Sequence, residues 1–120
     1  MKRDMDLIRS ILLELEKYPE PNGWADIKIE GYSIEEVSYH IKLLAQAELI
    51  EAYDVSDGSG FDWRASSLTW KGHEFLEAAR NPSRWQEAKK LISGKGESIT
   101  FEIIKTVLSE SIKSVIFPKI

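Results

Sequence analysis

The sequence predicts a mainly α-helical fold that also contains one small antiparallel β-ribbon, which places it in the α+β class. Apolar residues recur with the helical period in several segments of the 120 residues. Two short strand-like segments flank residues 57–60, a turn rich in glycine, serine and aspartate. The predicted order along the chain is helix, short strand, helix, two-stranded ribbon and three further helices.

The first predicted helix covers residues 4–17, where apolar residues fall on one face. Aspartates occupy its first turn, where the helix dipole favours negative charge. It ends in the segment 18–23, because the two prolines and the glycine there cannot continue a helix. A loose alternation of apolar and polar residues over 24–29 then predicts a short strand, with Gly31 as the turn after it.

The second predicted helix covers residues 33–48. Ser33 and Glu36 have the spacing of a capping box, in which each side chain bonds the free backbone N–H of the other residue. One face predicts a core shared with the first helix, and its residues are Ile34, Val37, Ile41 and Leu44 packed against Ile8, Leu12 and Leu15. The opposite face is the surface that this helix can offer to a partner, and its residues are Glu35, Tyr39, Lys42 and Gln46.

The segments 49–55 and 61–68 are predicted as the strands of the ribbon. Thr69 then caps a helix that runs to about residue 79. Pro82 is predicted to interrupt that helix and to begin the next one, since proline is tolerated in a first helical turn. The helix that follows, 83–92, is expected to turn these residues inward: Trp85, Ala88, and Leu91 or Ile92.

Ser98 is predicted to cap the final helix. Its apolar stripe contains Phe101, Ile104, Leu108, Ile112 and Val115. A helix, then a two-stranded ribbon, then a capped helix is the order of a winged helix-turn-helix. We therefore predict a winged-helix domain over residues 1–80 and two extra C-terminal helices over 81–120, packed on it to give a single compact domain.

The segment 37–50 resembles the recognition helix of small bacterial winged-helix repressors. The matching residues are Val37, Ser38, His40, Leu44, Ala47 and Leu49, with Ile41 and Ile50 as conservative changes. The segment departs from that pattern at Glu48, where the repressors have a glycine that ends the helix. A second stretch resembles the segment that follows the wing in several such families, through Leu68, Thr69, Gly72, Phe75 and Leu76.

The whole chain also resembles a family of uncharacterised winged-helix proteins of Gram-positive bacteria and their phages. The resemblance lies in residues 1–9, in Gly31 and Tyr32, and in the helix that contains Tyr39 and His40. It implies the winged-helix fold and a phage or prophage context. It carries no established activity.

Two features oppose DNA binding. Residues 1–80 contain 9 Lys/Arg and 16 Asp/Glu, a net charge of −7, whereas residues 81–120 contain 7 and 4, a net charge of +3. DNA-binding domains usually carry a positive surface, because neutralising phosphates supplies much of the affinity. In addition, no pattern for a positioning helix lies between residues 17 and 33, although a helix-turn-helix needs one before its recognition helix.

Two functions remain open from the sequence. In the first, slightly preferred because the fold is so often used this way, the protein is a DNA-binding transcriptional regulator. Tyr39, Lys42 and Gln46 would then face the major groove of double-stranded DNA, and Ser38 and Arg64 would contact phosphates. In the second, the acidic helix and ribbon form a protein–protein interaction module for a basic partner. The final helix could supply the seam of a homodimer.

An enzyme is not expected, because the chain has no phosphate-binding loop, nucleophile motif or metal-ligand spacing, and neither cofactor nor metal is predicted. His40 is interpreted as a packed or capping histidine, since His73, the only other histidine, lies on another helix. A solvated acidic surface is the interpretation of Glu35, Glu36, Asp54, Asp57 and Asp62. Core packing is the preferred role of Trp24, Trp63, Trp70 and Trp85.

The chain contains no cysteine, which excludes disulfides and thiol chemistry. No apolar run approaches the roughly 20 residues that span a bilayer. The start of the chain leads into a helical pattern and not into the apolar core of a signal peptide. A cytoplasmic location is therefore expected.

Overall fold

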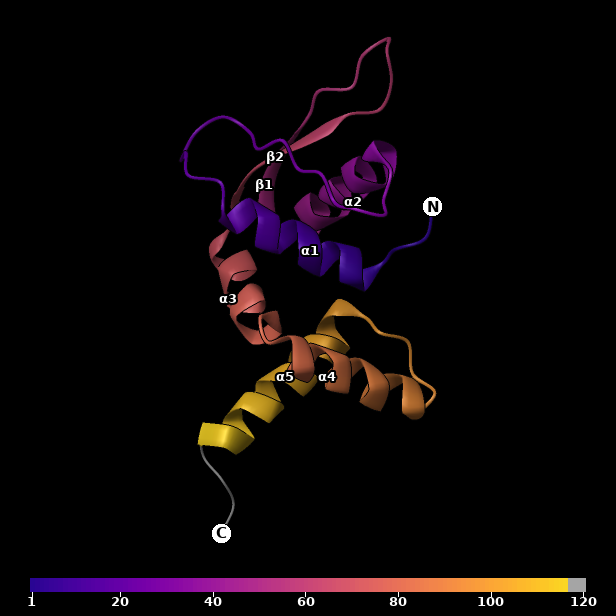
Figure 1. The fold of residues 1–120 in the computed structure, drawn as a ribbon, viewed down its shortest axis with the longest axis vertical. Helices are drawn as coiled ribbons and strands as arrows, with labels where there is room; N and C mark the ends of the chain where they lie inside the picture. Colours follow the sequence, from indigo (N-terminus) through magenta and orange to yellow (C-terminus); the bar gives the residue numbers. More distant parts are fainter. Residues whose placement is uncertain (117–120) are drawn as a thin grey trace. The chain divides into compact units, whose positions relative to one another are not determined.

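The structure, a computed structural model, describes residues 1–116, and at residue 115 it describes the backbone alone. Figure 1 shows the elements in order: α1 (Met5–Glu16), α2 (Ile34–Gln46), β1 (Ile50–Asp54), β2 (Trp63–Leu68), α3 (Trp70–Ala79), α4 (Pro82–Gly94) and α5 (Phe101–Ile116). The predicted class, mainly α with a small β-ribbon, is confirmed. The chain divides into two compact units, Met1–Glu74 and a second unit that begins at Phe75. That the two form a single domain stays a prediction.

Helix α1 begins after Asp4, whose side chain accepts the backbone N–H groups of Asp6 and Leu7. Its apolar face is buried and contacts α2 and β2 within the first unit. The buried residues are Met5, Leu7, Ile8, Ile11, Leu12 and Leu15. Because burying one such side chain contributes roughly 1.5–3 kcal/mol, this face is a major part of the core of the first unit.

The strand predicted over 24–29 does not form. Only Ala25 pairs with the ribbon, in an isolated bridge in which its N–H donates to the Ala65 oxygen at 2.8 Å. Ile27 and Ile29 are half-buried and alternate with exposed residues as predicted, but no residue of this segment other than Ala25 pairs with a strand. Residues 17–33 contain no helix, so α1 leads to α2 through irregular chain.

Helix α2 begins with the predicted capping box: Ser33 accepts the Glu36 N–H, and the Glu36 carboxylate accepts the Ser33 N–H, both at 3.0 Å. The predicted burial of Val37, Ile41 and Leu44 is confirmed. The predicted burial of Ile34 is wrong, because its side chain is 78% exposed. The irregular segment 25–28 does not cover the first turn of α2, and a hollow of about 100 Å³ remains between them.

Glu48 turns the chain from α2 into β1. It adopts φ 62°, the left-handed conformation that usually requires glycine, at the position where the repressor pattern has a glycine. The Leu49 N–H donates to the Leu44 oxygen and the Glu48 N–H to the Ala45 oxygen, each at 3.0 Å. These are the two bonds of a Schellman motif, so the backbone follows the glycine geometry although the residue is glutamate.

Helix α3 holds this turn from the other side. Thr69 caps α3 as predicted by accepting the Gly72 N–H at 3.0 Å, and its hydroxyl donates to the Glu48 oxygen at 2.7 Å. A Cβ atom added at Gly72 would overlap the carbonyl oxygen of Leu49. Glycine therefore permits the close approach of α3 to the start of β1.

The ribbon is antiparallel, with Ile50 opposite Leu68 at one end and Asp54 opposite Trp63 at the other. A bulge between Glu51 and Ala52 leaves Ser66 without an opposite residue, so the register shifts by one along β2. Helix α2 contacts both strands. In Figure 1 the segment between α1 and α2 loops out beside the ribbon and then crosses it to reach the start of α2.

In the second unit, α4 and α5 contact each other. Asn81 caps α4 by accepting the Arg84 N–H at 3.1 Å. The buried residues of these helices include Trp85, Ala88, Ile92, Ile104 and Leu108, largely as predicted, although Leu91 is 50% exposed. The cap of α5 is Thr100, whose hydroxyl accepts the Ile103 N–H at 3.3 Å, and not Ser98. The predicted inward position of the Val115 side chain lies outside the described residues.

The four tryptophans do not share one role. Trp85 is 1% exposed and meets Phe75 edge to face with ring centroids 6.4 Å apart, so its predicted place in the core is confirmed. Trp63 is half-buried. Core packing is wrong for Trp24 and Trp70, which are 49% and 82% exposed. Trp70 is the first residue of α3, and Trp24 precedes the single bridge residue Ala25, so neither is covered by a neighbouring element.

Candidate interaction surface of helix α2 and the ribbon

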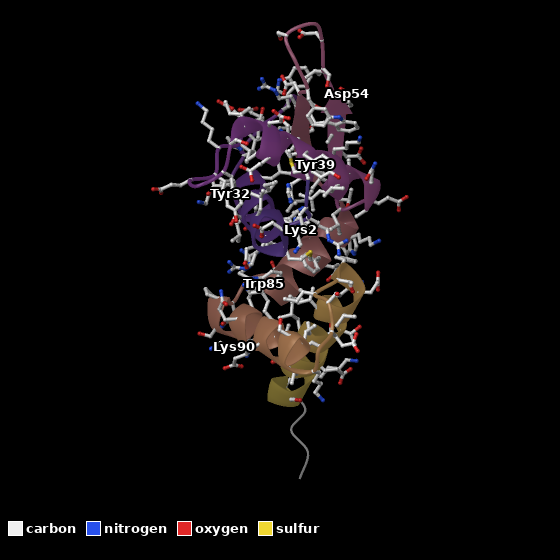
Figure 2. The ribbon with its side chains drawn as sticks, turned by 90° about the vertical axis from the view of Figure 1, so that its right-hand side faces the viewer. Lys2, Tyr32, Tyr39, Asp54, Trp85 and Lys90 are labelled. Carbon is white, nitrogen blue, oxygen red and sulfur yellow. The ribbon has the colours of Figure 1, made fainter. Side chains whose placement is uncertain are left out.

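The predicted site residues of α2 lie at different depths. Gln46 is exposed, Tyr39 and Lys42 are half-buried, and Ser38 is only 4% exposed. Figure 2 labels Tyr39 on α2 and Asp54 at the end of β1, the two elements that frame this surface. Because Ser38 lies on the core side of the helix, a large external group such as a phosphate does not reach it in this conformation.

His40 fastens α2 to the start of α1. It is 1% exposed, its Nδ1 lies 2.8 Å from the Glu36 carbonyl oxygen, and its Nε2 lies 2.9 Å from the Asp4 backbone nitrogen. A carbonyl can only accept and an N–H can only donate, so the ring is neutral with its proton on Nδ1. The packed or capping interpretation of His40 is confirmed.

Asp4 connects this histidine to the turn before α2. Its carboxylate accepts the Tyr32 hydroxyl at 2.7 Å while it also caps α1. This hydrogen bond is the main cause that raises the pKa of Tyr32 to about 12, since ionising the phenol would break it. The family resemblance includes Asp4, Tyr32 and His40, but nothing in their spacing along the sequence indicated that their side chains or backbone groups would meet.

The network also fixes where the first residues lie. The Asp4 N–H donates a hydrogen bond to His40 of α2. Lys2 and Arg3, both exposed, directly precede Asp4 in the sequence. Figure 2 labels Lys2 in the same unit as Tyr39. The bond between Asp4 and His40 thus holds the backbone that follows Lys2 and Arg3 against α2, although the two segments are distant in the sequence.

Arg64 is engaged by a neighbour on the ribbon. Its Nε lies 2.9 Å and its Nη2 3.2 Å from the two carboxylate oxygens of Asp62, a bidentate pair. The hydrogen bond to Asp62 is the main cause that raises the pKa of Arg64. A phosphate could reach this guanidinium fully only by displacing Asp62.

Lys42 is also placed among groups of this chain. Its Nζ lies 5.9 Å from the centroid of the Phe61 ring, within reach of a cation–π contact. The pKa of Asp54 is lowered, chiefly by its hydrogen bonds with Ser56 and least by the charge of Lys42. The same kind of cause, hydrogen bonds from Ser59, lowers the pKa of Asp57 at the ribbon tip. These carboxylates stay ionised at neutral pH.

Taken over α2 and residues 50–68, the surface carries two cations, Lys42 and Arg64. Six carboxylates share these elements: Glu35, Glu36, Glu51, Asp54, Asp57 and Asp62. No continuous positive strip therefore runs along the helix and the ribbon. Across residues 1–116 no group of three or more His, Cys, Asp or Glu side chains is arranged to hold a metal ion.

The first unit presents an exposed face of α2 and a projecting ribbon in which carboxylates outnumber cations, and a second, helical unit follows it in the chain. The chain belongs to the family described as "Hypothetical protein (DUF2513)", whose model matches residues 2–98. The match includes all of the first unit except Met1, and it continues through helix α4.

A protein of Haemophilus influenzae (strain ATCC 51907 / DSM 11121 / KW20 / Rd) named "Uncharacterized protein" is 44% identical over 108 residues, which are 89% of this chain and 92% of the relative. No solved structure matches the chain. Within the described part of the chain, every helix is too short or too polar to cross a membrane.

Proposed function

We propose that the protein is a winged-helix module that binds a basic partner protein through α2 and the ribbon. One observation carries the proposal: both cations of this surface are half-buried, whereas four of its six carboxylates are exposed, namely Glu35, Glu51, Asp54 and Asp57. The proposed role is binding alone, without a catalytic step or a cofactor.

The order of elements in the first unit supports the winged-helix part of the proposal. Helix α2 is followed directly by the antiparallel ribbon and then by α3. The bridge between Ala25 and Ala65 stands on the side of β2 away from β1, where a winged helix has a third strand. The ribbon extends past α2 in Figure 1, as a wing does.

The charges support a protein partner over nucleic acid. A DNA contact at Arg64 would have to break the bidentate pair with Asp62 and leave that carboxylate facing phosphates. Like charges in contact cost binding energy, whereas a basic protein surface would meet the same carboxylates favourably. The exposed acids of α2 and the ribbon therefore select a cationic partner.

Site-specific photo-crosslinking in the native host tests this proposal. A photoreactive amino acid at Gln46 should yield one discrete protein adduct, because Gln46 is exposed on the proposed face. The same amino acid at Lys90, exposed on α4 of the second unit, is the matched control and should not give that adduct. Glu35→Lys with Asp54→Lys should abolish the adduct at Gln46 if opposite charge drives binding. An adduct that survives both changes would contradict the proposal.

A DNA-binding transcriptional regulator is the second candidate, and one specific observation favours it. Lys2 and Arg3 directly precede Asp4, whose N–H is bonded to His40 of α2, and they could supply the phosphate contacts that Arg64 does not. Tyr39, Lys42 and Gln46 would then face the major groove.

Fluorescence anisotropy of labelled genomic fragments at low salt tests the DNA candidate. Binding in the range of about 10⁻⁴–10⁻⁶ M, falling steeply with salt, would indicate non-specific association. Lys2→Glu with Arg3→Glu should weaken it for all sequences, and Gln46→Ala should alter sequence preference. Tight binding to one fragment, lost in Lys42→Glu, would replace the protein-partner proposal with the DNA candidate. No binding by a folded sample would exclude DNA.

A further inference from the structure

A recess on the outer face of the ribbon lies away from α2. It has a volume of about 390 Å³ and lies between the segment 21–24, strand β1 and strand β2. Its lining includes two aromatic side chains, Trp24 and Tyr53, and one charged side chain, Glu51. None of these three was among the residues predicted to bind a partner.

The aromatic rings form a pair that stays open to solvent. Trp24 and Tyr53 have ring centroids 6.4 Å apart and planes inclined by 53°. They are 49% and 52% exposed, so each keeps about half of its surface free. Two large aromatic side chains exposed side by side are uncommon on a surface that meets only water.

The recess is held in shape by its supports. The Tyr18 hydroxyl donates to the Asn22 oxygen at 3.3 Å, and the Ala25 N–H donates to the Ala65 oxygen at 2.8 Å, so the chain is fixed on both sides of Trp24. Gly23 adopts φ 82°, which allows the turn between these two anchors. The indole is therefore presented by a braced turn.

The charge of the recess selects the ligand. Glu51 makes no ion pair with any described residue, unlike Glu14, Asp62 and Glu77, each of which meets a cation of this chain. A carboxylate beside two aromatic faces fits a side chain that is both cationic and flat. The guanidinium of arginine has this chemistry, because it stacks on aromatic rings and forms bidentate bonds with carboxylates.

We propose that this recess binds an arginine side chain carried on an extended segment of a partner protein. The guanidinium stacks on Trp24 or Tyr53 and bonds to Glu51, and the neighbouring backbone lies along the outer face of the ribbon. The net charge of the first unit, with 8 Lys/Arg and 15 Asp/Glu, attracts such a basic segment. The site shares the ribbon, and with it Glu51, with the surface proposed above, but no residue of α2 lines it, and it does not depend on binding at α2.

The test uses the full chain and a short fluorescent peptide in which arginines are spaced by glycine and serine. A matched peptide carries citrulline, which keeps the shape of arginine and lacks its charge. In the nitrogen-15 spectrum, the indole signal of Trp24 should move on addition of the arginine peptide, while that of Trp70, 82% exposed in the same unit, should not. The citrulline peptide should leave both signals in place.

Variants then measure the contributions. Trp24→Ala and Tyr53→Ala should each weaken the arginine peptide about fivefold, as expected for loss of a cation–π contact. Glu51→Gln should weaken it about threefold and reduce its dependence on salt. Trp70→Ala, which removes an exposed indole outside the recess, should leave the affinity unchanged. The affinity of a variant is interpreted only if its melting temperature and circular dichroism spectrum match those of the parent protein.

Three results would overturn the proposal. Equal binding of the citrulline peptide would show that the charge of arginine is not recognised. Equal weakening by Trp70→Ala and Trp24→Ala would show diffuse attraction to an acidic unit. A Trp24 signal that moves with protein concentration alone would assign the recess to a second copy of this chain. Loss of the α2 crosslink with intact peptide binding would instead count only against the α2 surface.

Discussion

The two ends of helix α2 are fixed by different physical means. At its N-terminal end, side chains from distant residues form a hydrogen-bonded set: Asp4 meets Tyr32 through its carboxylate and His40 through its backbone N–H. At its C-terminal end, the turn itself is made by backbone bonds, the Schellman motif at Glu48, and by the close approach of Gly72 to Leu49; side chains at the start of α3 add bonds to carbonyl oxygens of this turn.

This difference shows what each end tolerates. The N-terminal end depends on donors and acceptors, so a change that keeps shape but removes a polar atom should be felt there. The C-terminal end depends on space and backbone angle, so a single added carbon should be felt there. Because α2 carries both proposed partner-binding residues and the core, the two ends together decide how rigidly the candidate surface is presented.

The largest effect is expected at the C-terminal end. Gly72→Ala places a methyl group against the Leu49 carbonyl oxygen and should lower the free energy of unfolding by about 3 kcal/mol or more, as overpacking does at its upper limit. Urea unfolding measures it. Gly94→Ala is the matched control, since a Cβ at Gly94 meets nothing within 4 Å, and helix propensity should make it neutral or slightly stabilising. Equal behaviour of the two variants would refute the close approach.

The next effect is expected at the N-terminal end. His40→Leu keeps an apolar volume but leaves the Asp4 N–H without its acceptor, which should cost about 1–3 kcal/mol in the free energy of unfolding. His73→Leu is the control, because His73 is exposed on α3 and should change stability by less than about 0.5 kcal/mol. If His40→Leu were as stable as the parent, the hydrogen-bonded set would not hold α2.

Glu48→Gly returns to the C-terminal end with the opposite sign. Glycine adopts the left-handed conformation of φ 62° without steric cost, so the variant should be more stable by about 1 kcal/mol. Glu48→Ala keeps the Cβ atom and serves as the control, with no gain in melting temperature. A gain in both variants would point to the loss of the charge as the cause, and not to the backbone angle.

The smallest effect at neutral pH is expected for Tyr32→Phe, which removes one partly exposed hydroxyl and should cost about 0.5–1 kcal/mol. Its signature is the dependence on pH. The pKa of Tyr32 is raised to about 12 in the folded protein, above the roughly 10 of the unfolded chain, so this stabilisation is complete below pH 10 and is lost as pH rises through 12. The stabilities of parent and variant should therefore converge over that range. A constant difference would argue against the bond to Asp4.

Local patterns predicted most of the elements. Three features depend only on residues that are close in the chain: the capping box of Ser33 and Glu36, the helical period of α1 and the turn at 57–60. The local sequence is therefore enough to predict their conformation. The strand over 24–29 failed because a strand also needs a partner along its length, and only Ala25 finds one. The burial predicted for Ile34 failed because helical phase indicates the direction of a side chain but not whether another segment covers the first turn of the helix.

The surroundings of the candidate site residues were less predictable than the elements, for the same reason. The sequence by itself determined the class of fold, the exposed face of α2 and the acidic balance of the first unit, all of which follow from spacing and composition. Only the tertiary structure decided that Asp62 forms an ion pair with Arg64, that Ser38 faces the core, and that Trp24 lies beside Tyr53. These outcomes depend on which side chains meet after folding. Periodicity in the sequence carries no information about such pairings.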